Sequence, residues 1–168
     1  MDEAKFITLD NCLTILIYTD RSKSTNHMEL FTFYGGNYSS YIDYNGKKRN
    51  IKEGSAHLLE HYVCENTVSG DLLDNLRKYN VLSCNAGTSA FNTSYFFNTV
   101  CNFYECLDTF LDGIYNVSFT NEKLNKTKYA VLNEIRDSQN NEGRRIADIR
   151  DRTLFSNCMD NLGSEDSI

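Results

Sequence analysis

The stretch His57-Leu58-Leu59-Glu60-His61 holds two of the chain's three histidines, four residues apart, with a glutamate directly before the second. Side chains three and four residues apart lie on the same face of an α-helix. A helix over this stretch therefore places both imidazoles side by side, with the carboxylate next to them. Two neutral imidazoles from one helix are ligands that a catalytic zinc ion commonly takes. The stretch thus predicts a metal site on a helix.

The composition limits the classes of protein to which this chain can belong. The 168 residues are 40% hydrophobic and 12% aromatic, which fits one folded domain and excludes a disordered chain. The net charge is −6 and there is no long basic run, so we expect no nucleic-acid partner and no anionic membrane surface. No apolar run is long enough to span a bilayer.

The cysteines indicate a compartment. The chain shows no C-x-x-C pair and no secretory signal, so free, buried thiols in a reducing cytosol are favoured over a disulfide framework. We therefore expect a cytoplasmic protein. The six residues are Cys12, Cys64, Cys84, Cys101, Cys106 and Cys158.

Hydrophobic periodicity gives a coarse order of elements. Alternation predicts strands over 9–18 and 28–34, joined as a hairpin through 20–26, and a second hairpin over 81–88 and 93–100. Helical spacing predicts helices over 54–65, 69–79, 103–117, 121–140 and 144–155, with Ser55 capping the first and Ser69 or Asp71 the second. Residues 37–50 are polar and predict a loop. The order predicts an α+β fold with a largely antiparallel sheet and helices packed on one face.

A third metal ligand is expected on the helix over 121–140. Leu124, Val131 and Ile135 mark its buried stripe, and Glu134 lies beside that stripe. A carboxylate facing a core is costly unless a cation accepts it, and zinc would do so. Cys64 is a rival on the first helix, but seven residues of helix span about 10 Å, too far for one ion that also binds His57. A packed thiol is the better interpretation of Cys64.

Glu60 is the candidate general base. It lies beside the metal ligands, can accept a proton from a water whose pKa zinc lowers to about 7, and can pass the proton to a leaving amine. Two alternatives remain for the motif, a salt-bridged surface helix and an accidental metal binder. A structural zinc site is disfavoured because it usually needs four protein ligands, and three are found. Imidazole and carboxylate ligands with one open position suit zinc, and manganese and cobalt remain alternatives.

Three stretches together resemble the pitrilysin-like (M16, insulinase-type) zinc metallopeptidases. They are Gly54-Ser-Ala-His-Leu-Leu-Glu-His61, the segment from Asn85 to Tyr95 that reads N-A-G-T-S-A-F-N-T-S-Y, and Tyr129-Ala-Val-Leu-Asn-Glu-Ile-Arg136. The family shows a G-x-A-H-[FL]-L-E-H helix in the inverted H-x-x-E-H order, an N-A-x-T…T-x-Y hairpin and a V-x-x-E-I helix. The resemblance implies one pitrilysin/LuxS-like metallopeptidase repeat.

The resemblance also implies roles for individual residues. His57, His61 and Glu134 match the zinc ligands, and Glu60 matches the catalytic base. Asn85 and Ala86 match the edge that binds an extended peptide by strand addition. From the residues alone, Asn85 could instead be a turn residue that satisfies its own backbone.

Two departures from the family carry expectations of their own. Family members often have a second, assisting glutamate seven residues before the third ligand, and that position is Thr127 here. The end of the chain resembles the segment before a last helix and closing strands, which implies that residues 1–168 form one incomplete N-terminal peptidase domain.

The expected function is that of a zinc endopeptidase domain acting on short or unfolded peptides. Members of the family pair such a repeat with a second one, in the same or another chain, so we expect weak or absent proteolysis by this chain alone. The alternative is a non-catalytic scaffold or partner subunit of the same fold.

Overall fold

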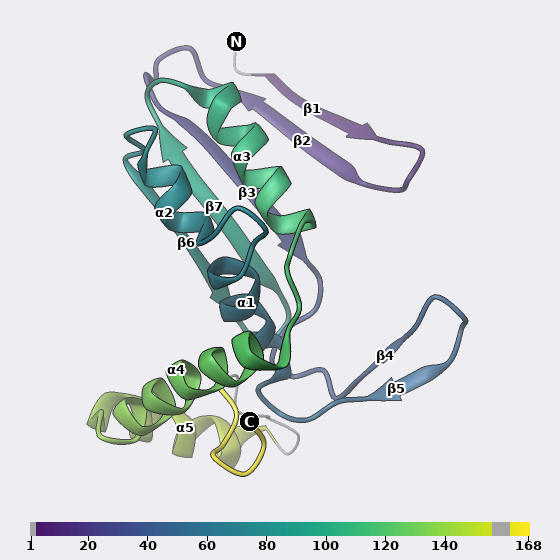
Figure 1. The fold of residues 1–168 in the computed structure, drawn as a ribbon, viewed down its shortest axis with the longest axis vertical. Helices are drawn as coiled ribbons and strands as arrows, with labels where there is room; N and C mark the ends of the chain where they lie inside the picture. Colours follow the sequence, from purple (N-terminus) through teal and green to yellow (C-terminus); the bar gives the residue numbers. More distant parts are fainter. Residues whose placement is uncertain (1–2, 156–161) are drawn as a thin grey trace.

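The computed structural model describes residues 3–155 and 162–168, with Arg152 described by its backbone only. Its centre is a three-stranded antiparallel sheet in the order β3 (Asn26–Thr32), β7 (Thr93–Thr99), β6 (Ser83–Thr88). Three helices, α1 (Ser55–Glu65), α2 (Leu72–Arg77) and α3 (Phe103–Tyr115), cover one face of this sheet (Figure 1). The predicted α+β class with antiparallel pairing and helices on one face is confirmed.

The core lies between this sheet and the three helices. Alternate residues of β7 are buried, so Tyr95 and Phe97 face the helices. Phe97 is fully buried and meets the ring of Phe110 at a centroid distance of 5.4 Å. Leu72 and Leu76 of α2 complete the packing. This core fixes α1, with the His57–His61 stretch, against β6 and β7.

The predicted hairpin between residues 9–18 and 28–34 is wrong. Residues 9–13 instead form a tight turn, closed by the backbone of Leu9 and by Cys12 with a φ of 68°. This turn joins β1 (Glu3–Thr8) to β2 (Thr14–Thr19), which form a sheet of their own. β3 pairs with β7 instead. Alternation identified β2 and β3 but not β1, and the alternation of side chains does not reveal with which strand a backbone pairs.

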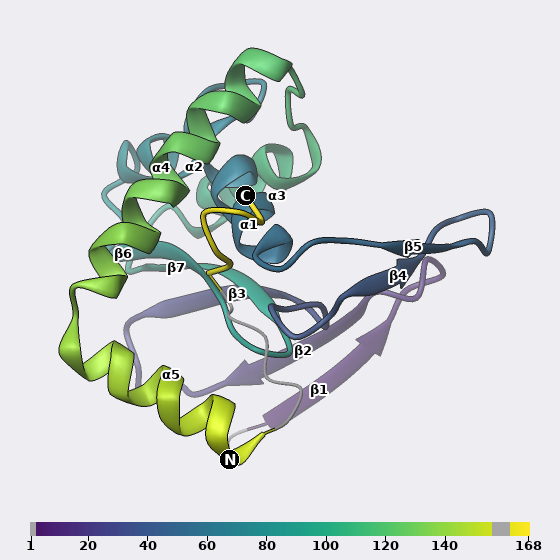
Figure 2. The ribbon, with the colours of Figure 1, turned by 90° about the horizontal axis from the view of Figure 1, so that it is seen from below.

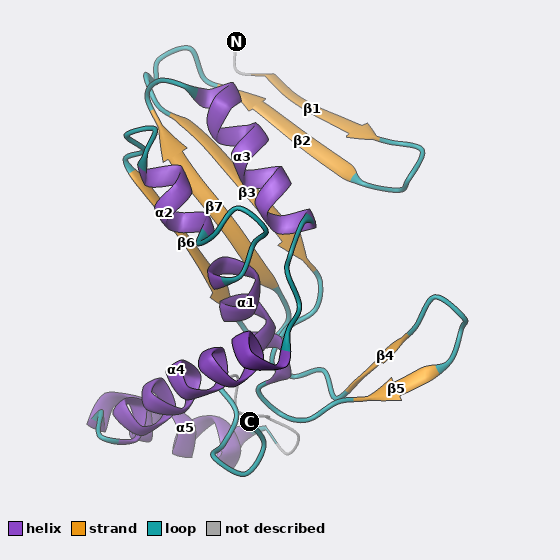
Figure 3. Cartoon of the chain, in the orientation of Figure 1, coloured by secondary structure: helices purple, strands orange, loops and turns teal. Residues whose placement is uncertain are grey.

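Residues 37–50 are not a plain loop. They contain β4 (Ser40–Ile42) and β5 (Lys48–Asn50), a short antiparallel hairpin that projects from the molecule (Figure 3). The Asp43 side chain accepts hydrogen bonds from the backbones of Asn45 and Lys47, and Gly46 supplies a φ of 75°. The polar composition that suggested a loop arises because the two strands are short and exposed and a turn joins them.

The helices lie close to their predicted ranges, with local corrections. Gly54, not Ser55, is the N-cap of α1, with a φ of 77° and no side-chain cap. Asp71 caps α2 by accepting from the Asp74 backbone, so that helix begins later than predicted. Leu59 of α1 is 50% exposed, although it is apolar.

Two further helices follow at the end of the chain. α4 (Asn121–Gln139) lies beside α1, and α5 (Glu142–Leu154) continues from it (Figure 2). Val131 and Ile135 of α4 form a second buried cluster with Leu162, against which Leu58 of α1 packs. This cluster sets the register of α4 on α1.

Residues 162–168 return to the start of α1. A Cβ atom on Gly54 would lie 2.6 Å from the Leu162 carbonyl oxygen and 2.7 Å from the Gly163 Cα. Only glycine permits this approach at a positive φ.

The described cysteines are free, as predicted, but they are not all buried. Cys64 and Cys106 are buried, whereas Cys12 and Cys101 are exposed. Cys158 lies outside the described residues. Within residues 3–155 and 162–168, no helix has both the length and the apolar character needed to cross a membrane.

Candidate metal centre

Two helices bring the three predicted ligands together. His57 and His61 project from α1 one turn apart, and Glu134 projects toward them from α4. Leu58 packs against the cluster around Val131, which holds the two helices in this register. The periodicity of α4 thus places a carboxylate beside the imidazole pair.

The three donor atoms form a nearly equilateral triangle. The Nε2 atoms of His57 and His61 are 3.2 Å apart, and Oε2 of Glu134 lies 3.4 Å from the first and 3.2 Å from the second. A tetrahedral zinc ion with bonds of about 2.0–2.1 Å separates its ligand atoms by about 3.3–3.4 Å. The donor set and its spacing therefore fit zinc, with one position left for water or substrate.

Burial favours the neutral form of His57, which is the form that binds metal. Its ring is 6% exposed, and this burial lowers its pKa, while the Glu134 carboxylate acts in the opposite direction. The lowered pKa favours the neutral ring, which is the form that binds a metal ion. The backbone of Leu162 interacts with the ring and, like Glu134, acts to raise its pKa.

Glu60 lies beside the triangle without belonging to it. It is 8% exposed, and its Oε2 accepts a 2.8 Å hydrogen bond from the Thr88 hydroxyl. Burial raises the pKa of Glu60, and the hydrogen bond from Thr88 partly offsets this. A carboxyl group with a raised pKa is suited to carry a proton in both directions.

Sequence reasoning missed the role of Thr88. This residue lies on β6, where every second side chain faces the helices. Side chains two residues apart on a strand face the same side of the sheet. Because Thr88 follows Ala86 by two residues in a predicted strand, the sequence could have placed Thr88 on the face that α1 covers.

A second missed residue is Glu65, four residues after His61 on α1. Its Oε1 lies 3.6 Å from Nδ1 of His61, and its Oε2 accepts a 2.9 Å hydrogen bond from the Thr127 hydroxyl. Thr127 is fully buried and continues the stripe of Val131 on α4. The i, i+4 spacing was the available signal for the contact with His61.

Asn85 and Ala86 lie on β6, at the edge of the three-stranded sheet. Asn85 is exposed and Ala86 is half-buried opposite Tyr95. Asn85 is part of a regular strand, so its interpretation as a turn residue is wrong. The strand packs beside α1, which brings its edge close to the helix that carries the histidines.

Cys64 is a packed thiol, as its position predicted. It belongs to the buried core with Tyr95 and Leu72, and burial raises the pKa of the thiol. A thiol with a raised pKa is a poor nucleophile and a poor metal ligand.

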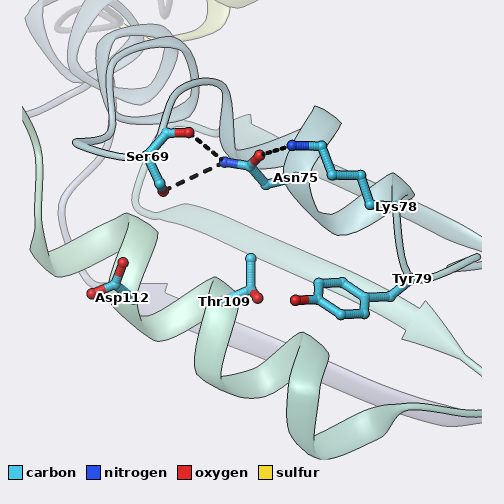
Figure 4. Close-up of a pocket in the computed structure, with 6 residues that line it drawn as sticks. All are labelled: Ser69, Asn75, Lys78, Tyr79, Thr109 and Asp112. Atoms are coloured by element: carbon cyan, nitrogen blue, oxygen red, sulfur yellow. Dashed lines mark hydrogen bonds between the residues drawn. The ribbon is translucent and has the colours of Figure 1, made fainter.

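A separate pocket lies between α2 and α3 and contains none of the predicted site residues (Figure 4). The Asn75 side chain crosses it, donating to the Ser69 carbonyl and accepting from the Lys78 amine. Its lining residues are Ser69, Asn75, Lys78, Tyr79, Thr109 and Asp112. The pocket has no connection with the chemistry of the metal centre.

Comparison with solved structures shows the same fold in known peptidases. An M16-like peptidase from Alicyclobacillus acidocaldarius is similar over 86% of this chain and 33% of its own, with a TM-score of 0.77 and 23% identity. Pitrilysin is similar over 99% of this chain and 18% of its own, with a TM-score of 0.75 and 18% identity.

Comparison of sequences leads to a family. The uncharacterized zinc protease YmfH of Bacillus subtilis (strain 168) is 26% identical over 140 residues, which are 82% of this chain and 32% of that protein. The chain thus spans about a third of the length of this relative. The family model described as insulinase (peptidase family M16) matches residues 47–163 and so includes all three donor residues. The chain belongs to the insulinase family of peptidases, family M16.

Proposed function

We propose that this chain is the zinc-binding, catalytic part of an endopeptidase that hydrolyses short or unfolded peptides. The observation that carries the proposal is the triangle formed by His57, His61 and Glu134, with sides of 3.2–3.4 Å. Glu60 lies buried beside it as a fourth group that is not a ligand. Membership of a peptidase family and the similarity to a protein named as a zinc protease support zinc as the cofactor.

The roles of the side chains follow from their positions. Bound zinc supplies a Lewis acid that acidifies water to a pKa of about 7 and polarises the peptide carbonyl. Glu60 accepts the proton of the attacking water and returns it to the leaving amine. Thr88 holds one oxygen of Glu60 by its hydrogen bond, so the other oxygen is available to the proton.

The edge of β6 is the proposed place for the substrate. An extended peptide can add to a free strand edge by backbone hydrogen bonds. Asn85 and Ala86 would bind the peptide backbone there, and a Cβ at Gly87 would have no neighbour within 4 Å. Because the bound peptide must be extended, the proposal favours short or unfolded substrates.

A second M16-type repeat is the proposed partner. The chain spans about a third of the similar zinc protease, and pitrilysin matches over only 18% of its own length. We propose that residues 1–168 form one incomplete N-terminal domain and that another repeat closes the chamber around the peptide. The free cysteines of the described residues support a reducing, cytoplasmic location. The net charge of −6 disfavours nucleic acid and anionic membranes as partners.

One observation favours a second candidate, a non-catalytic partner subunit. Thr127 stands where the family resemblance places an assisting glutamate. A partner subunit that does not catalyse hydrolysis does not need that carboxylate and could lose it while keeping the fold.

Metal analysis combined with a peptidase assay tests the proposal. Wild type, Glu134→Gln and Glu60→Gln are purified, and zinc is measured by elemental analysis. We expect about one zinc per chain in wild type and in Glu60→Gln, and much less in Glu134→Gln, because Glu134 supplies a ligand and Glu60 does not. A quenched fluorescent peptide without secondary structure then reports turnover over long incubation.

The assay separates the two candidates. Slow, zinc-dependent cleavage by wild type that is absent in Glu60→Gln supports the peptidase. Full zinc occupancy with equal, measurable cleavage by wild type and Glu60→Gln would contradict Glu60 as the general base, whereas full zinc occupancy without any cleavage by wild type would favour the partner subunit. A wild-type chain without zinc would overturn the metal site itself.

A further inference from the structure

The two nitrogens of the His61 ring face different groups. Nε2 points into the donor triangle, 3.2 Å from Oε2 of Glu134. Nδ1 faces the Glu65 carboxylate, whose Oε1 is 3.6 Å away. A neutral imidazole carries its proton on one nitrogen only, and a metal binds the other. A negative charge beside Nδ1 favours the proton there and leaves the lone pair of Nε2 directed at the metal.

The Glu65 carboxylate is held in place by a chain of hydrogen bonds. The Asn66 side-chain amide donates to the Thr127 hydroxyl at 3.1 Å, and that hydroxyl donates to Oε2 of Glu65 at 2.9 Å. Because the amide can only donate here, the single proton of Thr127 is directed at Glu65. The same Asn66 amide donates to the Tyr62 carbonyl, which anchors the chain to the backbone of α1.

Burial distinguishes this arrangement from a surface ion pair. Thr127 is 0% exposed and Asn66 is 6% exposed, so the anchoring groups are shielded from water. Glu65 itself keeps 30% of its side chain exposed, and only one of its oxygens is tied by the threonine. The other oxygen is left facing His61. At 3.6 Å it is beyond hydrogen-bond length and acts on the ring by its charge.

We propose that Glu65 is the positioning residue for His61, which keeps the ring proton on Nδ1 so that Nε2 can bind zinc. This inference rests on the zinc site proposed above and goes beyond it. It also gives Thr127 a function: the carboxylate that the family resemblance places at position 127 on α4 is here supplied by α1. Thr127 supports it from the opposite helix.

Zinc affinity is the first test, measured by competition with a chromophoric chelator. Glu65→Gln is nearly isosteric and removes the charge, and we expect it to weaken zinc binding about 10–100-fold. Thr127→Val keeps the charge but removes the tether, and a smaller weakening of several-fold is expected. The matched control is Glu122→Gln, which removes an exposed carboxylate from α4 and should leave zinc binding unchanged.

The tautomer of His61 is the second test and needs no metal. In the metal-free chain, ¹⁵N NMR of the imidazole nitrogens reports which one is protonated. We expect mainly the Nδ1-protonated ring in wild type and a shift toward Nε2 in Glu65→Gln. A purely structural role of Glu65 would not move this ratio.

A third test moves the carboxylate from α1 to α4. Glu65→Ala should weaken zinc binding, and the double variant Glu65→Ala with Thr127→Glu should recover much of it, because the carboxylate returns from α4. Zinc affinity and tautomer ratio of Glu65→Gln equal to wild type would overturn the inference while leaving the zinc site intact. Absence of zinc in wild type would count against the proposed function, and the tautomer ratio would still decide the role of Glu65.

Discussion

The site region and the N-terminal hairpins of this chain are built in opposite ways. Around the metal centre, α1 lies between the central sheet and α4, and the buried Glu60 has a hydrogen-bond partner in Thr88. The hairpins β1–β2 and β4–β5 each form a separate two-stranded sheet. They carry large side chains such as Phe6, which is 71% exposed, and Tyr44, which is 98% exposed.

The two regions differ in how tightly their side chains are packed. Two-stranded sheets are marginal by themselves, whereas a sheet covered by helices holds its residues in fixed positions. A catalytic constellation needs such fixed positions, and residues 47–163, which match the family, contain β6, β7 and the three helices that cover the sheet. Substitutions should therefore be costly in the site region and mild in the hairpins.

The largest expected difference is between two phenylalanines. Phe97→Ala removes a fully buried ring from the core and should cost about 3–5 kcal/mol in the free energy of unfolding. Phe6→Ala truncates an exposed ring on β1 and should change stability by less than about 0.5 kcal/mol. Urea unfolding followed by circular dichroism measures both. Equal losses would mean that β1–β2 is packed as tightly as the core.

Two glycines with the same backbone angle provide the next comparison. Gly54 and Gly46 have φ of 77° and 75°, so alanine is strained at both, by about 1–2 kcal/mol. At Gly46 a Cβ meets nothing within 4 Å, whereas at Gly54 it meets backbone atoms at 2.6 and 2.7 Å. Gly54→Ala should therefore cost about 2–4 kcal/mol and Gly46→Ala only the strain. If the urea midpoints of the two variants fall equally, the contact with residues 162–163 does not contribute to stability.

The smallest expected effect concerns two threonines on strands. Thr88→Val removes the hydrogen bond to the buried Glu60 and should cost about 1–2 kcal/mol. Thr14→Val on the exposed face of β2 should be neutral within about 0.5 kcal/mol. Zinc affinity should stay near wild type in Thr88→Val, since this residue touches no ligand. A large loss of zinc would instead place Thr88 in the metal site.

Local pattern was enough to predict the helices that carry the site. The spacing of His57, Glu60 and His61 predicted one face of α1, and the stripe around Val131 predicted which side of α4 faces the core. The structure brings Glu134 to the two histidines as that pattern suggested. Their assignment as zinc ligands stays a proposal.

What the sequence could not predict depends on contacts between distant segments. The strand signal in residues 9–18 holds for residues 14–18, but nothing in it indicated that β2 pairs with β1 and that β3 pairs with β7. Glu65 was not singled out from the sequence, because its partner Thr127 lies on another helix. Leu59 is apolar and yet half-exposed, so side-chain type alone did not decide its burial.

The close approach of Gly54 to Gly163 has a consequence for the order of folding. His57 and His61 are neighbours in sequence, but Glu134 joins them only when α4 packs on α1, and the contact with Gly163 closes a still longer loop. Long loops close late because their closure entropy must be offset by packing. We therefore expect zinc to find a complete site only after the rate-limiting step of folding. The ion should slow unfolding and leave the refolding rate nearly that of the metal-free chain.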